Sequence, residues 1–305
     1  MNRWNVIKAG ISVSLTGQFH VQGRQALAGL QAWIDDVNRS GGIPLSPGSA
    51  GLKVDLVHYD DASIARQACA VTERLILKDR VDLLFGPYSS VLASTSAVVA
   101  EEHSRVMWNQ GGASDDVYEQ GYRYVVGILT PATRYLSGLL PMVREASREA
   151  ATVGIVRAST GGFPKAVTSG VESQAGRWGF KLDFIEEYDV AVTDFPGLAR
   201  KLAAVAPDVL VSVGRIGNAL SLADCLVDYR PAFKSVAVVA APIQQFRDRL
   251  KRDAEGFLGP SQWESGLDYP HDYGPSSREV LVSLASRCRA LVAAVGVGYP
   301  RVEGD

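Results

Sequence analysis

The order of apolar and polar stretches constrains the fold of this chain more than any other feature of its sequence. Short apolar runs at about residues 7–15, 52–59 and 81–85 are each followed by a polar loop and then by helical composition. The same alternation begins again at Thr152. Alternating strands and helices form parallel sheets with right-handed crossovers. We therefore predict an α/β fold whose two successive halves form two lobes with a cleft between them.

Local signals place individual elements within this pattern. The helix after the first strand ends at Gly41-Gly42, because glycine suits the left-handed conformation of a helix C-terminus. A helix is predicted from Asp60-Asp61 to about Lys78, and another from the pair Thr130-Pro131 to about Arg148. Ser276 to Glu279 form a capping box at the start of a late helix. Strands of the second half are predicted at 153–156, 182–188, 209–213 and 236–240.

The stretch from Val81 to Glu102 carries the first candidate site. It reads as a strand, a break at Gly86-Pro87, two hydroxyls at Ser89 and Ser90, and a helix. Ligands of open parallel sheets bind at the carboxyl ends of strands. The N–H groups of the helix start, with the serine hydroxyls, would form a seat for a small anion. The other interpretation is that Ser89 or Ser90 only caps the helix, and the stretch taken alone favours it.

A second loop follows the next predicted strand, at 105–109. Gly111 and Gly112 let the backbone approach a ligand closely. Ser114 or Asp115 can cap the short helical turn that we expect after the loop.

Composition excludes several classes of protein. A chain of 305 residues, of which 47% are hydrophobic, can bury a full hydrophobic core, and its length suggests about two domains. The formal charge of -2 provides no basic field for nucleic acid. No apolar run approaches the roughly 20 residues that cross a bilayer. The N-terminal residues show no leader, so the chain as written is not expected to be exported. We interpret Cys69, Cys225 and Cys288 as structural thiols.

Motifs of catalysis are missing from the sequence. Gly17 and Gly23 do not have the spacing of a dinucleotide fingerprint, and no P-loop or Gly-x-Ser-x-Gly elbow occurs. The four histidines lie far apart and lack metal-ligand spacing. We interpret Asp60-Asp61 as caps and helix-dipole partners. The sequence therefore predicts no enzyme, no cofactor and no metal, and its polar loops suit binding of a small molecule.

Five motifs, in this order, resemble those of the type I periplasmic binding proteins of branched-chain amino acid and amide ABC transporters, the Leu/Ile/Val-binding proteins among them. They are Asp60-Asp61-Ala62, Phe85 to Ser90, Gly111 to Asp115, Asp194 to Leu198, and Asp253 to Trp263. The resemblance covers about residues 6 to 280.

This resemblance implies two Rossmann-like lobes, joined by three crossings, that close on a ligand by a hinge motion. It places an N-terminal lobe at 1–127, to which 265–305 return incompletely, and a C-terminal lobe at 128–264. Compared with the family, the chain is expected to be truncated or rearranged after the helix that begins at Ser276 to Glu279, which would leave apolar surface of the first lobe uncovered.

The resemblance also implies roles for individual residues. The loop of Ser89 and Ser90 would bind the ligand's α-carboxylate, and the loop from Gly111 to Ser114 would contact the ammonium and the carboxylate. Phe163 would place its ring over the ligand, and Arg215 would follow the strand whose loop closes on the ligand's side chain. The candidate ligand-binding residues are Gln18, Tyr88, Ser89, Ser90, Gly111, Gly112, Ala113, Ser114, Phe163, Arg215 and Pro242.

Two positions depart from the family pattern. Ile243 stands where an acid would hold the ammonium, so the pattern does not support recognition of a free α-ammonium group. Arg215 either faces the ligand, which favours a second negative charge on it, or is a solvated loop arginine.

The sequence thus predicts the substrate-binding component of an ABC transporter, which takes an amino acid or a related small amide. Its expected partners are that ligand and membrane permease subunits, without nucleic acid, and its expected location is the periplasm. The alternative is a cytoplasmic amide or amino-acid sensor that uses the same fold to regulate a partner protein, an alternative that the missing leader keeps open.

Overall fold

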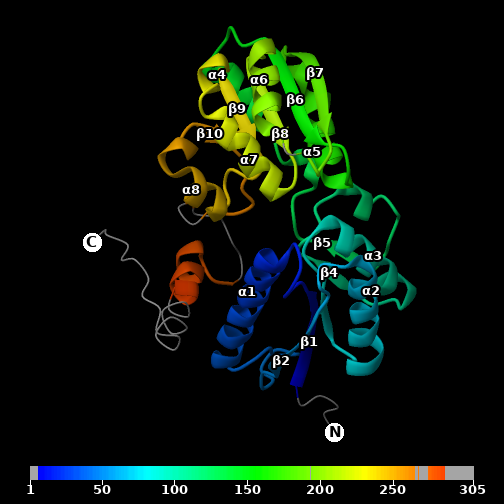
Figure 1. The fold of residues 1–305 in the computed structure, drawn as a ribbon. Helices are drawn as coiled ribbons and strands as arrows, with labels where there is room; N and C mark the ends of the chain where they lie inside the picture. The colour runs from blue at the N-terminus through cyan, green and yellow to red at the C-terminus, as the bar shows by residue number, and fades with distance from the viewer. Residues whose placement is uncertain (1–5, 193, 265–266, 268–273, 286–305) are drawn as a thin grey trace. The chain divides into compact units, whose positions relative to one another are not determined.

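The computed structural model describes residues 6–192, 194–264, 267 and 274–285. The chain divides into two compact units (Figure 1). Unit 1 comprises Met1–Tyr88, Thr95–Gln110 and Trp263–Asp305, and unit 2 comprises Ser89–Ser94 and Gly111–Gln262. The predicted α/β class is confirmed, since two five-stranded sheets alternate with helices along the chain.

The first sheet has the strand order β2-β1-β3-β4-β5, and its ladders between β1 and β2, β1 and β3, and β3 and β4 are parallel. Its strands are β1 (Val6–Val13), β2 (Lys53–Asp60), β3 (Leu83–Phe85), β4 (Met107–Asn109) and β5 (Val125–Gly127). The helices that follow its strands are α1 (His20–Arg39), α2 (Ala65–Arg74), which continues as a π turn over Leu75–Asp79, and α3 (Ser90–Glu102). Helix α1 covers one face of β1 to β3, whereas α2 and α3 lie on the other face (Figure 1).

The second sheet has the order β10-β9-β8-β6-β7, and all of its ladders are parallel. Its strands are β6 (Thr152–Ala158), β7 (Lys181–Tyr188), β8 (Val209–Val213), β9 (Ser235–Val238) and β10 (Phe257–Leu258). Its α-helices are α4 (Leu139–Ala146), α5 (Gly162–Ala175), α6 (Phe195–Val205), α7 (Ile216–Leu226) and α8 (Gln244–Leu250). Short 3₁₀ turns cover Asp115–Val117, Ala132–Arg134, Gly176–Trp178, Arg230–Ala232 and Lys251–Ala254.

The core of unit 2 consists of two apolar clusters on opposite faces of its sheet. Leu210 in the middle of β8 joins the cluster that α6, α7 and α8 cover, while Val209 and Val211 join the one that α4 and α5 cover. Successive side chains of a strand point to opposite faces, so a strand buried on both sides is apolar throughout. This explains why the sequence Val-Leu-Val-Ser-Val of β8 shows no polar alternation.

The helix predicted from Thr130 to about Arg148 is wrong in its first half. The structure has a 3₁₀ turn at Ala132–Arg134 and begins α4 only at Leu139, after Gly138. Thr130 caps nothing, because the Asp115 carboxylate accepts hydrogen bonds from the N–H (3.1 Å) and hydroxyl (2.8 Å) of Thr133 instead. The Asp115 side chain, from an earlier loop, thus stabilises a separate 3₁₀ turn before α4 begins.

The paired acids at the end of β2, Asp60 and Asp61, fix two loops rather than cap a helix. Asp61 is fully buried and accepts hydrogen bonds from the hydroxyls of Ser12 (3.0 Å) and Ser14 (2.5 Å). Helix α2 begins at Ala65, and its N-cap residue Ile64 makes no side-chain cap. The expected cap is therefore wrong, and the carboxylate instead joins the end of β1 to the loop after β2.

The capping box predicted at Ser276 is confirmed. The Ser276 N–H and hydroxyl both donate to Glu279 Oε2 (2.8 Å each), and the Glu279 N–H donates to Ser276 Oγ (3.3 Å). A helix follows over residues 277–285.

Candidate ligand-binding site

Two hydrogen bonds join the start of α3 to the loop after β4, within unit 2. The Ser89 N–H donates to the Gly111 carbonyl (3.0 Å), and the Ser114 N–H donates to Ser90 Oγ (3.0 Å). The two stretches that the sequence indicated separately are therefore parts of one local structure.

The two serines of the first loop have different roles. Ser89 has a positive φ of 83° and its hydroxyl accepts a hydrogen bond from the Leu92 N–H (3.4 Å), so it caps α3. The hydroxyl of Ser90 accepts from the second loop instead. Among the described residues, the N–H groups of Ser90 and Val91 meet no acceptor, as expected for the first turn of a helix. These two N–H groups and the Ser90 O–H are donors that an anion could use.

Ser114 supplies a further donor to the same place. Its side chain is only 2% exposed, and its hydroxyl has no hydrogen-bond partner among the described residues. Nearly all buried hydroxyls in proteins have a partner, and leaving one without costs about 1–3 kcal/mol. The Ser114 hydroxyl, beside Ser90, can therefore donate a hydrogen bond to an acceptor on a ligand.

The start of α5 lies against the Ser114 hydroxyl. A Cβ atom placed on Gly162 would be 2.8 Å from Ser114 Oγ and 2.3 Å from Asp116 Oδ2. Only glycine fits at this first position of α5, and the helix N-terminus faces the Ser114 hydroxyl and the Asp116 carboxylate. The carboxylate complements the positive end of the helix dipole.

Asp116 was not among the residues that the sequence indicated. It follows Ser114-Asp115 directly, but an acid in a loop gives no signal of its own. Its position beside Ser114 depends on the packing of the 3₁₀ turn at Asp115–Val117 against the start of α5.

Phe163 is the second residue of α5, and the ring of Tyr135 contacts its ring. It packs edge-on against the Tyr135 ring, with centroids 5.4 Å apart at 78°, and both rings lie against the α4–α5 core cluster. Unit 2 thus brings Ser89, Ser90, the loop from Gly111 to Ser114, and the start of α5 together.

The carbonyls of the second loop already accept hydrogen bonds. Ala113 O accepts from the Ala132 N–H (2.7 Å), and Gly112 O accepts from the Tyr118 hydroxyl (3.2 Å). A carbonyl oxygen has two lone pairs, so Ala113 O keeps one for a ligand.

Among the described residues, the remaining candidates of unit 2 form no hydrogen bond or ring contact with this group. Arg215 is the exposed N-cap of α7, and Pro242 lies against Gly259 in the loop after β9. Ile243, placed by the sequence where an acid would stand, packs on the core cluster under α6 to α8.

Two candidate residues belong to unit 1. Tyr88 packs edge-on against Phe19, with ring centroids 5.8 Å apart, and burial raises the pKa of its hydroxyl. Gln18 is exposed in the loop between β1 and α1.

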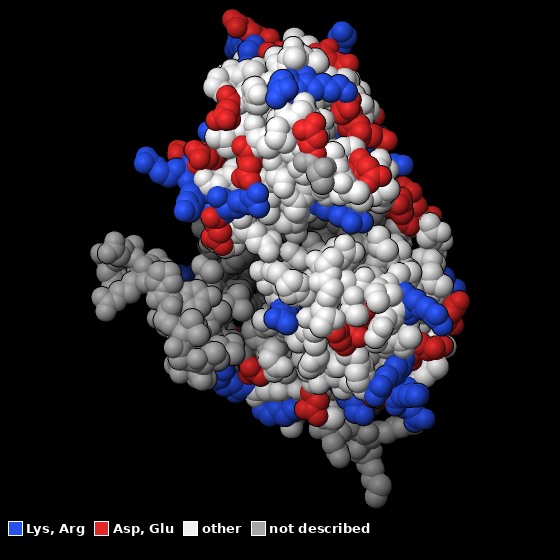
Figure 2. Space-filling model, in the orientation of Figure 1, with Lys and Arg blue, Asp and Glu red and all other residues white. Residues whose placement is uncertain are grey.

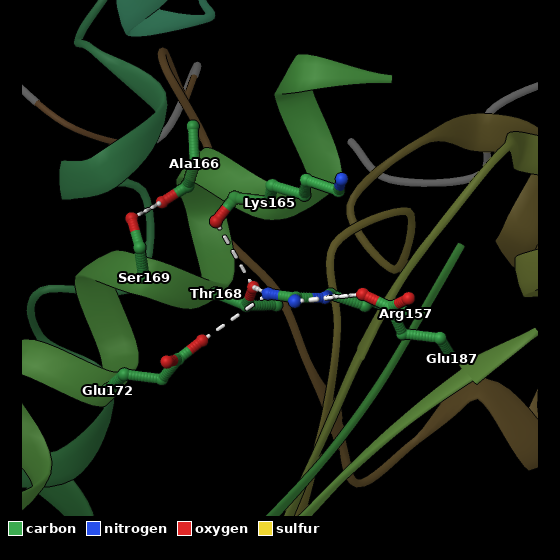
Figure 3. Close-up of polar contacts among 7 residues, drawn as sticks. All are labelled: Arg157, Lys165, Ala166, Thr168, Ser169, Glu172 and Glu187. Carbon is green, nitrogen blue, oxygen red and sulfur yellow. Dashed lines mark hydrogen bonds and ion pairs between the residues drawn. The ribbon is translucent and has the colours of Figure 1, made fainter. Parts of the chain in front are cut away.

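An ion-pair cluster fastens α5 to the sheet of unit 2 (Figure 3). Arg157 at the end of β6 binds Glu187 of β7 through Nε (3.0 Å) and Nη2 (2.8 Å). Its Nη1 donates to Thr168 Oγ1 (2.6 Å) and pairs with Glu172 (3.3 Å), both on α5. The Arg157 side chain is 16% exposed. The cluster holds the helix whose first turn carries Gly162 and Phe163.

The described residues on the face drawn in Figure 2 show no field of one sign. Lysine and arginine alternate with aspartate and glutamate on the face that Figure 2 shows. In the described part of the chain, no three histidine, cysteine or acidic side chains gather as a metal site would require. The described helices include none with the length and apolar character of a membrane span.

Comparison with known proteins places these features in a family context. The sequence profile of the family described as periplasmic binding protein matches residues 6–273. The leucine-specific-binding protein of Salmonella typhimurium is 27% identical over 120 residues, which are 39% of this chain and 31% of that protein. The Leu/Ile/Val-binding protein homolog 8 of Brucella abortus is 29% identical over 119 residues, 39% of this chain and 28% of that protein. The matches thus span less than a third of the length of these curated relatives.

Solved structures share the fold at low sequence identity. The branched-chain amino acid transporter substrate-binding protein LivJ of Streptococcus pneumoniae, in complex with isoleucine, has a TM-score of 0.73 at 17% identity. The match covers 93% of this chain and 78% of LivJ. A solute-binding protein of an R. palustris ABC transporter, in complex with benzoate, has a TM-score of 0.75 at 14% identity. That match covers 93% of this chain and 74% of the other.

Proposed function

Since the chain belongs to the periplasmic binding protein family, we propose that it is the substrate-binding component of an ABC transporter. Its ligand is a small molecule with a carboxylate, an amino acid or a related amide. The curated relatives are named for leucine, isoleucine and valine, and the solved structures of similar fold hold isoleucine or benzoate. A carboxylate is common to all of these ligands.

The observation that carries the proposal is the buried Ser114 hydroxyl without a partner. It lies beside Ser90, whose N–H and that of Val91 are available at the start of α3. Together they provide hydroxyl and backbone N–H donors for the carboxylate of a ligand, at the positive end of a helix dipole. Hydrogen bonds to a charged group are worth about 1.5–3 kcal/mol each, so three of them would supply most of the roughly 8 kcal/mol of micromolar binding.

Asp116 supports an amino acid as the ligand. Its carboxylate lies next to the Ser114 hydroxyl, on the same side of Gly162. We assign it the role of accepting the α-ammonium group, in place of the acid that the loop at Ile243 lacks. Phe163 would cover the apolar part of the ligand, because its ring is held in place by Tyr135.

Binding without chemical conversion is part of the proposal. The proposed partners are the permease subunits of the transporter, and the proposed location is the periplasm, both by membership of the family. Incubation with the bound ligand should return it unchanged in mass spectrometry. A product that forms in proportion to the protein would overturn this part of the proposal.

The experiment begins with a thermal-shift screen over amino acids, amides and benzoate-type acids, because a ligand of the folded state raises the melting temperature. Calorimetry on Ser114→Ala should then show at least tenfold weaker binding of the ligand found, about 1.4 kcal/mol. The ligand-free variant should melt no lower than the parent, since it loses a hydroxyl that has no partner. Ser169→Ala, an exposed serine of α5, is the matched control and should bind normally. Unchanged affinity in Ser114→Ala would refute the proposed seat.

Asp116→Asn tests the ammonium contact separately. It should weaken an amino acid at least tenfold and leave a carboxylic acid without an ammonium group unaffected. Equal effects on both classes would mean that Asp116 serves only the helix dipole of α5.

A further inference from the structure

Three hydrogen bonds tie the second loop of the candidate site to the 3₁₀ turn that precedes α4. The Ala132 N–H donates to the Ala113 carbonyl (2.7 Å). The N–H and the hydroxyl of Thr133 donate to the two carboxylate oxygens of Asp115, at 3.1 Å and 2.8 Å. Ala113 precedes Ser114 and Asp115 follows it. The loop is therefore held on both sides of the residue whose buried hydroxyl has no partner among the described residues.

The same turn lies on α5 through a close backbone contact. Gly170 of α5 is buried, and a Cβ atom placed on it would lie 1.8 Å from the Thr133 carbonyl oxygen. Only glycine allows the backbone of the turn to come this close to the helix. Thr133 therefore contacts α5 through its carbonyl, and the loop of Ser114 through its N–H and hydroxyl.

Helix α5 also meets this loop directly, at its first residue. A Cβ atom on Gly162 would lie 2.8 Å from Ser114 Oγ. Gly162 and Gly170 are two intervals of four residues apart, about 12 Å along the helix, and positions at such intervals share one face. The helix thus meets the loop at Gly162 and, through Thr133, at Gly170. Two points on one rigid element fix the orientation of the loop as well as its position.

The Ser114 hydroxyl needs this support, because it makes no hydrogen bond among the described residues. A buried hydroxyl without a partner is unfavourable, so a movement of the loop that paired it within the protein would stabilise the ligand-free state. The three bonds to the turn oppose such a movement. They keep the hydroxyl available before a ligand arrives, so the site is preorganised.

We propose that Thr133 is a positioning residue, which acts through Asp115 to hold the Ser114 hydroxyl where a carboxylate can accept its hydrogen bond, a role that rests on the proposed function of this seat. The hydroxyl of Thr133 is the specific part. Any residue except proline offers the N–H that Asp115 accepts, whereas the second bond requires a side-chain donor. Without that donor, one oxygen of Asp115 loses its partner and the carboxylate can turn about the remaining bond.

Amide hydrogen exchange of the ligand-free full chain, read residue by residue by NMR, tests the positioning directly. In Thr133→Val, which keeps the shape of the side chain and the backbone bond, the Ser114 N–H should lose protection. Its exchange should accelerate at least tenfold more than that of the β8 amides, which report the stability of unit 2 as a whole. Thr133→Ser restores the hydroxyl and should restore slow exchange. Ser137→Ala, an exposed serine of the same segment, is the matched control and should exchange like the parent.

Calorimetry with L-leucine, the amino acid for which a relative is named, adds a readout of binding. Thr133→Val should weaken L-leucine binding at least fivefold in the parent and add no further loss to Ser114→Ala, because Thr133 acts through Ser114. Thr133→Ser should bind like the parent. Where the parent takes up no L-leucine, the exchange experiment decides alone.

Failure of the positioning role and failure of the proposed function give different results. Equal acceleration at Ser114 and in β8 would mean that Thr133 only stabilises unit 2, and unchanged exchange at Ser114 would likewise overturn the positioning role. So would a loss of affinity that adds to that of Ser114→Ala. Unchanged affinity of Ser114→Ala itself would refute the proposed seat, whereas the exchange of the Ser114 N–H would still decide whether Thr133 holds the loop.

Discussion

The Asp60 carboxylate joins the end of β2 to the loop that follows β1. It accepts hydrogen bonds from the N–H groups of Leu15 (2.8 Å) and Ala62 (2.8 Å) and from the Thr16 hydroxyl (2.7 Å). Burial raises the pKa of this carboxyl, but the hydrogen bonds outweigh burial and lower the pKa below the ordinary 3.8. The lowered pKa means that the folded state favours the charged form.

This shift makes stability depend on pH in a definite direction. The folded pKa lies below the unfolded one, so the contribution of Asp60 is fully present above pH 3.8 and is lost as the pH falls through the lower folded value. Asp60→Asn should cost about 1 kcal/mol at neutral pH and flatten the pH profile below pH 3.8. Urea unfolding between pH 3 and pH 7 measures both effects. Parallel profiles of variant and parent would contradict the assigned pKa shift.

Tyr188 and Gly214 form a contact that the sequence does not reveal. The Tyr188 hydroxyl is buried without a partner among the described residues, and burial raises its pKa to about 12. A Cβ atom on Gly214 would lie 1.8 Å from the hydroxyl oxygen. The glycine is therefore required by the hydroxyl that fills its side-chain space.

Substitutions at these two residues should be coupled. Tyr188→Phe should be neutral or stabilising, because it removes an unpaired buried hydroxyl. Gly214→Ala should cost about 1–3 kcal/mol by overpacking in the parent and much less in the Tyr188→Phe background. A double-mutant cycle by chemical denaturation measures the coupling. Additive effects would mean that the alanine is accommodated elsewhere.

The sequence identifies site residues only where a loop carries its own signal. Ser89, Ser90 and Ser114 follow predicted strands, so their loops could be found. That the Ser114 N–H binds Ser90 Oγ, or that Asp116 lies against Gly162, could not be found, because these pairings depend on how the loops pack.

At the scale of elements, prediction succeeded where local chemistry decides. The strand at 209–213 was placed without error, and the capping box at Ser276 formed as predicted. It failed at Thr130 to Arg148, where the Asp115 carboxylate from a distant loop competes with the expected cap. A contact between segments that are apart in sequence carries no local signal.

Helix α5 depends on one such contact, the Arg157 cluster (Figure 3). Arg157 of β6 donates hydrogen bonds to Glu187 of the neighbouring strand β7 and to Thr168 of α5. Arg157→Leu removes these bonds and leaves two carboxylates without their cation, so it should lower the free energy of unfolding by about 2 kcal/mol. Arg157→Lys should recover only part of this, because lysine cannot form the two-pronged contact.

The matched control for this prediction is Lys165→Met. Lys165 lies on the same helix, and its ammonium group points away from the cluster in Figure 3. It should leave stability within about 0.5 kcal/mol of the parent in urea unfolding. An equal loss in the control would show that charge on α5, rather than the Arg157 contacts, matters.

At the scale of the whole molecule, the two units differ in how the chain builds them. Unit 1 is assembled from three separate segments. Unit 2 consists mainly of one continuous stretch, Gly111–Gln262, to which the short earlier segment Ser89–Ser94 is added. Both apolar clusters of unit 2 lie within that stretch. Its core therefore requires no residue of unit 1.

A fragment of residues 111–262 should consequently fold by itself. It retains the parallel ladders of β6 to β10, loses the contacts from Ser89 and Ser90, and separates β5 from the other strands of the first sheet. The fragment should unfold in urea as a single cooperative transition and keep near-ultraviolet circular dichroism, with little binding of the dye ANS. Retained helix content with strong ANS binding and no near-ultraviolet signal would mark a molten globule, and would show that the core of unit 2 depends on the rest of the chain. Addition of the Ser89–Ser94 stretch at the N-terminus of the fragment, through a glycine-serine linker, should then raise its stability, since it restores the acceptor of the Ser114 N–H.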